Sequence, residues 1–86
     1  MSEWEIADNG FAYRCGKNFR EKIYITEKYD VCYASAAIAD DDSIVKFDTK
    51  TLKSGIAGRS NAELTVQQFA SDFNDLLKLK KKNNDD

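Results

Sequence analysis

The sequence predicts an α+β fold: an antiparallel β-meander of about five strands over residues 2–58, with one C-terminal amphipathic helix packed on one face of the sheet. Three observations support this prediction. Short segments in the first half of the chain alternate apolar and polar residues, which is typical of half-buried strands. Turn-forming residues separate these segments. One apolar stripe with helical spacing follows over residues 65–80.

The first two predicted strands flank a tight turn. Residues 3–6 alternate Glu with Trp and Ile, and residues 11–15 alternate Phe, Tyr and Cys with Ala and Arg. Residues 8–10 (Asp-Asn-Gly) lie between them, and an Asn-Gly pair readily adopts the positive φ angles that a short hairpin turn requires. Residues 16–18 (Gly-Lys-Asn) predict the next turn in the same way.

Three further strands are predicted over residues 20–26, 31–39 and 44–48, each separated from the next by turn residues. The second of these contains an alanine-rich stretch, 34–39, with good helix propensity, so a short helix is the competing prediction there. Two glycines interrupt residues 49–60. We expect an irregular connection in that segment, with at most one short edge strand.

The C-terminal helix has a predicted start signal. Thr65 fits as the N-cap, and Gln68 completes a capping box three residues later. Ser60 with Glu63 offers an alternative start one turn earlier. The predicted stripe consists of Val66, Phe69, Phe73, Leu76, Leu77 and Lys80. We expect one domain over residues 1–82, followed by a disordered tail at 83–86.

The predicted strands assign side chains to the two faces of the sheet. Small residues share one side of the fourth strand, where close approach of a helix is easiest, and we expect the helix to pack there: Cys32, Ala34, Ala36 and Ile38. The other face then carries Tyr24 and Tyr33, with Lys22 and Lys46 nearby. Tyrosines and cations on an open sheet suit a recognition surface. Ordinary cross-strand packing is the alternative interpretation.

Composition excludes several kinds of chemistry. The chain of 86 residues has no histidine and two cysteines, so a Ser-His-Asp triad, an imidazole-ligated metal and a four-thiolate zinc site are excluded. We expect no cofactor, no metal and no catalytic residues. Cys15 and Cys32 are expected to be buried thiols in a reducing compartment, with a disulfide or a redox role as the alternatives.

An acidic turn is predicted between the fourth and fifth strands. Asp40, Asp41 and Asp42 are adjacent, and the sequence after them lacks the Gly and Glu that a calcium-binding EF-hand loop requires. Adjacent carboxylates repel one another, so they remain solvated or face a complementary surface. The interpretations are therefore a solvated hairpin tip, a contact patch for a basic partner and a weak site for a divalent cation.

The chain resembles a class of proteins and no single family. Its small size, acidic pI of 5.1 and α+β pattern are similar to those of many small phage or mobile-element proteins that inhibit a host factor, anti-CRISPR proteins and DNA mimics among them. That resemblance assigns no functional role to any particular residue of this chain. We predict a non-enzymatic, cytoplasmic protein-binding module, and the resemblance implies that such a module can act as an inhibitor of a host factor. It would bind a basic partner through Asp40–Asp42 and through the sheet face that carries Tyr24, Tyr33 and Lys22. We expect no membrane association.

Two alternatives remain at the level of sequence. A small nucleic-acid-binding domain would stack bases on tyrosines and contact phosphates with basic residues, using Tyr13, Arg14, Lys17 and Arg20 in addition to the sheet residues above. The net charge of −2 predicts weak affinity for nucleic acid. The third hypothesis is a homo-oligomeric structural protein, such as a homodimer, that pairs through an exposed sheet edge.

Overall fold

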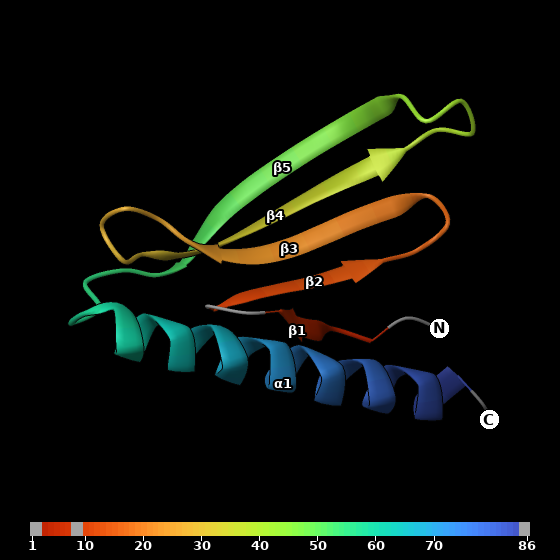
Figure 1. Cartoon of the computed structure of the whole chain (residues 1–86). Coiled ribbons are helices and arrows are strands. Elements are labelled where there is room, and N and C mark those ends of the chain that lie inside the picture. Colours follow the sequence, from red (N-terminus) through yellow and green to blue (C-terminus); the bar gives the residue numbers. More distant parts are fainter. Residues whose placement is uncertain (1–2, 8–9, 85–86) are drawn as a thin grey trace.

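The computed structural model describes residues 3–7 and 10–84, and it has the α+β fold that the sequence predicts (Figure 1). Within these residues, five strands form one antiparallel sheet in chain order. The strands are β1 (Glu5–Ala7), β2 (Phe11–Cys15), β3 (Phe19–Ile25), β4 (Val31–Ile38) and β5 (Ile44–Lys53). A single helix, α1 (Arg59–Asn84), packs against one face of this sheet.

The helix covers only part of the sheet. It lies against β1, β2, β3 and the edge of β4, and β5 lies beyond it (Figure 1). The core fills the space between α1 and the first strands and consists of Trp4, Ala12, Ile23, Val31, Ala62, Val66 and Ala70. The side-chain amide of Asn74 holds β1 to α1: it accepts a hydrogen bond from the Trp4 backbone N–H at 2.7 Å and donates one to the Trp4 carbonyl at 3.2 Å.

The helix begins six residues before the predicted N-cap. Gly58 has a φ of 90° and ends the preceding loop, and its carbonyl accepts a hydrogen bond from the Ala62 N–H at 3.2 Å. Thr65 lies inside the helix, where its hydroxyl donates to the Asn61 carbonyl. The capping-box prediction was wrong because the buried stripe starts one turn earlier, at Ala62, whose small side chain is a weak hydrophobic signal.

At its other end the helix extends beyond residue 80, to Asn84. The predicted disordered tail therefore overlaps the helix at 83–84, and its last two residues, 85–86, lie outside the described residues. Two other predictions also fall outside them: the side chain of Lys80 in the apolar stripe, and the first two residues of the turn at 8–10. Gly10, the third residue of that turn, has the expected positive φ, 74°.

The fifth strand is longer than predicted. It continues through Lys53, across the first part of the segment that was expected to be irregular. Thr49 pairs with Ala34 and Thr51 pairs with Cys32, with register shifts toward both ends of the strand. Threonine is β-branched and favours a pleated strand, which is the local reason that pairing with β4 continues past residue 48.

The predicted assignment of faces was wrong for β4, although β4 is a strand and not the competing helix. Ile23 pairs with Tyr33, and Tyr24 pairs with Cys32. Residues directly opposite in an antiparallel pair point to the same face, so Tyr33 lies on the helix-covered face with Ile23. The small side chains that were expected beneath the helix lie on the opposite, uncovered face. Tyr33 fills the space that a smaller residue would leave beside α1, and its ring centroid is 6.4 Å from that of Phe73.

Candidate functional site

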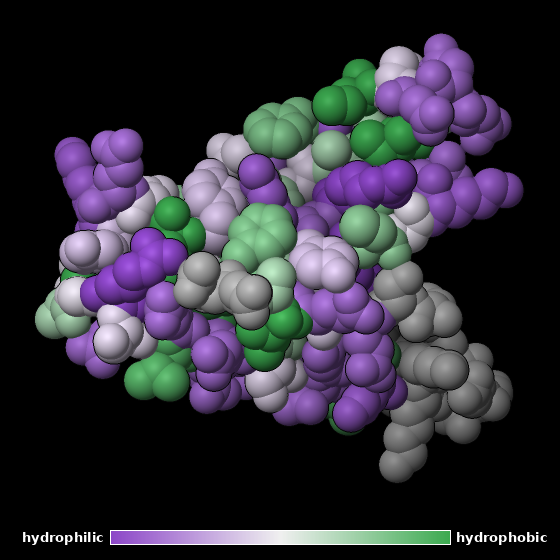
Figure 2. All heavy atoms as spheres, in the orientation of Figure 1, coloured by the Kyte–Doolittle hydropathy of each residue, from purple (hydrophilic) through white to green (hydrophobic). Residues whose placement is uncertain are grey.

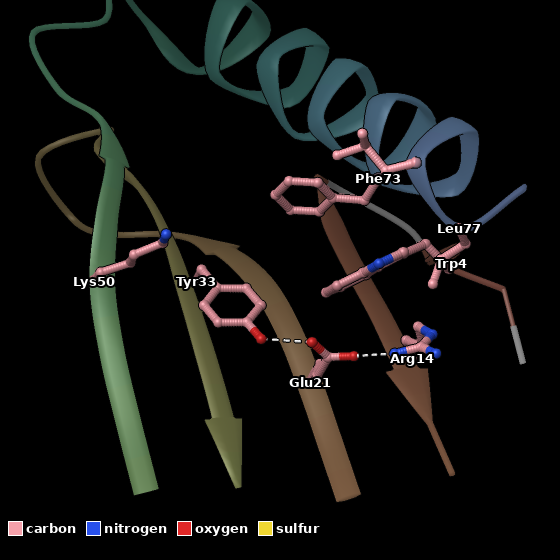
Figure 3. A pocket seen from close by; sticks show the side chains of 8 residues that line it. Trp4, Arg14, Glu21, Tyr33, Lys50, Phe73 and Leu77 are labelled. Carbon is pink, nitrogen blue, oxygen red and sulfur yellow. Dashed lines mark hydrogen bonds and ion pairs between the residues drawn. The ribbon is translucent and has the colours of Figure 1, made fainter. Parts of the chain in front are cut away.

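A polar cluster lies on the helix-covered face, beside the C-terminal half of α1 (Figure 3). Glu21 is at its centre and points one carboxylate oxygen toward Arg14 and the other toward Tyr33. The Arg14 Nη1 atom is 2.5 Å from Glu21 Oε1, and the Tyr33 hydroxyl donates to Glu21 Oε2 at 2.5 Å. The Arg14 guanidinium also stacks over the Phe19 ring, 4.6 Å from its centroid. The three side chains connect β2, β3 and β4.

A pocket of about 360 Å³ opens above this cluster. Trp4, Phe73 and Leu77 form its apolar wall, and Lys50 reaches it from β5, with its Nζ atom 6.0 Å from the Tyr33 ring centroid (Figure 3). Burial, followed by the hydrogen bond to Glu21, raises the pKa of Tyr33 above its usual value. Tyr33 is therefore a neutral donor at physiological pH, and the cluster holds its own charges in place beneath the helix.

The uncovered face of the sheet has a row of aromatic and basic side chains. Tyr13 pairs directly with Lys22 across β2 and β3, and the Lys22 Nζ atom is 5.0 Å from the Tyr24 ring centroid. The Phe11 and Tyr13 rings stack with centroids 6.2 Å apart. The Tyr13 hydroxyl donates to Glu5 Oε2 at 2.8 Å, and this hydrogen bond is the main reason that the pKa of Tyr13 is raised.

An apolar trough continues from this row toward the ends of β4 and β5. It has a volume of about 430 Å³, and its lining includes Phe11, Tyr13, Ala36, Ile38, Ile44 and Phe47. Its β5 side is strongly exposed, since Ile44 and Phe47 keep 62% and 59% of their surface accessible. Figure 2 shows apolar side chains gathered over the ends of β4 and β5, beside the hydrophilic turn that joins them.

The acidic turn lies at the end of the trough. Asp40, Asp41 and Asp42 are all exposed, and Asp42 adopts a positive φ of 68°. The Asp41 carboxylate accepts hydrogen bonds from the Ser43 N–H at 3.1 Å and from the Ser43 hydroxyl at 2.6 Å, which lower the pKa of Asp41. The Asn18 side chain donates to the Ile38 carbonyl at 3.1 Å and so ties this turn to the β2–β3 turn.

The structure brings together only some of the residues predicted for partner binding. Lys22 and Tyr24 share the uncovered face, and the three aspartates lie at the end of the hairpin that borders it. Tyr33 does not belong to this surface, because it lies on the helix-covered face.

The residues predicted for nucleic-acid binding are also divided. Tyr13 lies on the uncovered face, whereas Arg14 engages Glu21 on the other one. The Arg20 guanidinium donates to the carbonyls of Gly16 and Phe19, both at 2.8 Å, and so supports the β2–β3 turn. Lys17 is exposed within that turn.

The two cysteines differ in their surroundings. Cys32 is a buried free thiol, as predicted, and its Sγ atom lies 3.8 Å from the Thr51 hydroxyl. Cys15 is a free thiol too, but it is exposed, so its predicted burial was wrong. It ends β2 on the uncovered face, where no helix covers it.

The exposed apolar residues of β5 were missed at the level of sequence. The segment Ile-Val-Lys-Phe, which follows the three aspartates after one serine, was available as a signal. It was interpreted as an ordinary half-buried strand because the alternation of residues does not show how far one helix extends across a sheet.

Comparisons with protein-family models, with curated proteins and with solved structures find no match to this chain. In the part of the chain that the structure describes, no helix combines the length and the apolar character needed to cross a membrane. Among those same residues, no three His, Cys, Asp or Glu side chains come together in a group that would hold a metal ion.

Proposed function

We propose that this chain is a non-enzymatic protein-binding module that uses the uncovered face and the acidic turn against a basic protein partner. By analogy with small phage and mobile-element proteins, the proposed consequence of binding is inhibition of that partner. One observation carries the proposal: the apolar trough on the uncovered face ends at three exposed aspartates. The proposed location is the cytoplasm, where both free cysteines stay reduced.

The trough supports protein binding through its composition and exposure. Contiguous exposed apolar patches on soluble proteins commonly mark interaction sites. Aromatic side chains contribute large contact areas with few rotatable bonds, and here Phe11, Tyr13 and Phe47 line the same hollow. Burying Phe47 beneath a partner would remove the largest exposed aromatic surface of β5 from water.

The acidic turn supports a partner of the opposite charge. Hydrogen bonds from Ser43 lower the pKa of Asp41 and so favour its ionised form at physiological pH. Adjacent carboxylates attract a basic surface and accelerate its approach, most strongly at low salt. The trough beside them then supplies the contacts that hold the complex.

Nucleic acid is the competing ligand class. Lys22 beside Tyr13 and Tyr24 is an arrangement on which single-stranded bases stack. Arg14 and Arg20 are engaged within the fold, and the acidic turn repels phosphates. We therefore argue for a protein partner and treat nucleic acid as an outcome of the test.

The test combines site-specific crosslinking with measured affinity. A photoreactive phenylalanine analogue replaces Phe47 in the trough or Gln67, which is exposed on α1, as the matched control. A protein captured from Phe47 and not from Gln67 is purified and titrated against the wild type, Phe47→Ala and the triple variant Asp40→Asn/Asp41→Asn/Asp42→Asn.

We expect Phe47→Ala to weaken binding by about tenfold or more, as for an aromatic anchor. The triple variant is expected to weaken it strongly at low salt and less at high salt, because screening already reduces the charge contribution. Equal capture from both positions, or unchanged affinity in both variants, would contradict the proposal. Tight binding of a labelled oligonucleotide that falls steeply with salt would assign the surface to nucleic acid.

A further inference from the structure

We infer that two copies of this chain pair along the free edge of β5 to form one continuous antiparallel sheet. The strand has ten residues, and nine of them are exposed. Within the described residues it pairs only with β4, so the backbone groups on its other side have no strand partner. The opposite edge, β1, has three residues and contacts α1. A long exposed edge strand is a template for pairing with another strand.

The irregularities of β5 leave its centre available for such pairing. Register shifts fall between Val31 and Cys32 and between Ala37 and Ile38, that is, near the two ends of β5. Residues 46–51 follow a regular ladder with β4. Bulges bend a strand and interrupt pairing locally, so this central segment is the part able to support a second ladder.

Two-fold symmetry and charge select the register. In a symmetric dimer, if residue i faces residue j, then j also faces i. A dimer centred on Asp48 would place this carboxylate against its own copy and Lys46 against Lys50, and like charges directly opposite are destabilising. A dimer centred on Thr49 instead places each Asp48 opposite Lys50 of the second copy.

The register centred on Thr49 also accommodates the exposed aromatic residue. It places Phe47 opposite Thr51 of the second copy, and an aromatic side chain opposite a β-branched one is a favourable cross-strand pair. A dimer centred on Phe47 would bring Lys46 opposite Asp48, but only residues 46–48 of the regular segment would then pair. The Thr49 register pairs five regular residues, 47–51, from each copy and has two complementary charge pairs.

The same geometry joins the two recognition surfaces. A two-fold axis perpendicular to the sheet places the same face of both copies on the same side. The uncovered faces therefore become continuous, with the two α1 helices together on the opposite side. This inference is independent of the proposed partner, because it concerns the purified chain alone.

A charge swap across the interface tests the inference by sedimentation equilibrium from micromolar to about millimolar concentration. Asp48→Lys places lysine opposite Lys50, and Lys50→Asp places aspartate opposite Asp48. Each variant is expected to raise the dimer dissociation constant by about tenfold or more, because two attractive pairs become repulsive. The double variant Asp48→Lys/Lys50→Asp is expected to restore dimerisation.

Lys28→Asp is the matched control for Lys50→Asp, because Lys28 is exposed outside β5 and the charge change is the same. It is expected to dimerise like the wild type, and thermal unfolding verifies that all variants are folded. A wild-type chain that remains monomeric over the whole range would overturn the inference. A dimer that resists both single substitutions, or that the double variant fails to restore, would overturn the Thr49 register.

Discussion

The half of the sheet beneath α1, formed by β1, β2 and β3, contrasts with the outer half at β5, which lies beyond the helix. In the helix-covered half, Ile23 on β3 and Val66 on α1 are fully buried. In the outer half, every residue of β5 except Leu52 is exposed, although the strand pairs with β4 over most of its length. Backbone pairing alone thus extends the sheet, while burial of side chains depends on the helix. Stability therefore concentrates beside α1, and accessible surface concentrates on β5.

The width of a helix explains this contrast. An α-helix with its side chains is about 10 Å across, and neighbouring strands are about 4.8 Å apart. One helix therefore shields about two to three strands, and a sheet of five strands has more width than α1 covers. Tyr33 lies at the margin of the covered region, where its ring contacts the helix and its hydroxyl reaches Glu21.

The largest expected effect is a core truncation in the covered half. Ile23→Ala removes a fully buried side chain from the sheet and leaves a cavity beneath α1. We expect it to lower the free energy of unfolding by about 2–5 kcal/mol. Phe47→Ala removes a larger but exposed side chain from β5 and is expected to change that free energy by less than about 1 kcal/mol. Denaturant unfolding of both variants measures the difference, and equal losses would contradict the assignment of stability to the covered half.

A pair of glycines sharpens the comparison at the level of the backbone. Gly10 and Gly55 have similar positive φ angles, 74° and 69°. A Cβ atom at Gly10 would lie 2.6 Å from Ile25 Cδ1 and 3.2 Å from the Glu63 Cα atom of α1, whereas nothing lies within 4 Å at Gly55. Both alanine variants introduce the same kind of backbone strain, so their difference isolates the steric clash.

We expect Gly10→Ala to lower the free energy of unfolding by about 1–3 kcal/mol more than Gly55→Ala does, because the clash pushes the helix away from the sheet. Thermal or denaturant unfolding of the two variants checks this value. Equal effects would mean that the helix adjusts its position without loss of packing.

The free energy of unfolding should depend on alkaline pH through Tyr33, which lies at the margin of the covered half. Burial and then the hydrogen bond to Glu21 raise the pKa of Tyr33 in the folded chain. Ionisation is easier in the unfolded state, so this contribution to stability is intact below about pH 10 and is lost as the pH rises through the folded pKa. The free energy of unfolding is expected to fall less steeply above pH 10 in Tyr33→Phe than in the wild type.

Glu21→Gln is the companion variant. It removes the carboxylate but not the burial, which is the larger cause, so the pKa of Tyr33 should fall only part of the way to its usual value. It also removes the ion pair between Glu21 and Arg14 and is expected to lower the free energy of unfolding by about 1–2 kcal/mol at neutral pH. An NMR titration of the Tyr33 ring measures its pKa, and an unchanged value would contradict the role of the hydrogen bond.

The smallest expected effect lies at the tip of the outer half. Ser43→Ala removes a hydroxyl that hydrogen-bonds to Asp41, so the pKa of Asp41 should rise toward its usual value of about 3.9. Because the pKa of Asp41 is lower in the folded chain than in the unfolded chain, its ionised form stabilises the fold at pH values above the unfolded pKa. This contribution is lost as the pH falls through the folded pKa. An NMR titration of the Asp41 carboxyl measures the change, with Ser54→Ala as a control in the β5–α1 connection. A pKa unaffected by Ser43→Ala would show that the hydroxyl bond does not persist in solution.

The candidate site was predictable only in parts. The acidic turn is visible in three consecutive aspartates, and Lys22 and Tyr24 alternate on a strand whose outer face was correctly assigned. Tyr33 was misplaced because β4 has small or β-branched residues on both sides, so its own alternation does not identify the buried side. Only the pairing of Ile23 with Tyr33 decides it.

Local preferences of neighbouring residues were sufficient to predict the order of the strands, the turns between them and the presence of one C-terminal helix. Which side of β4 the helix covers, where α1 begins and how far β5 extends became clear only from the packed structure. Each of these depends on contacts between segments that are distant in the chain, such as Ala62 in the core and Thr51 opposite Cys32. Alternation and propensity describe one segment at a time, whereas burial is a property of the segments that pack against it.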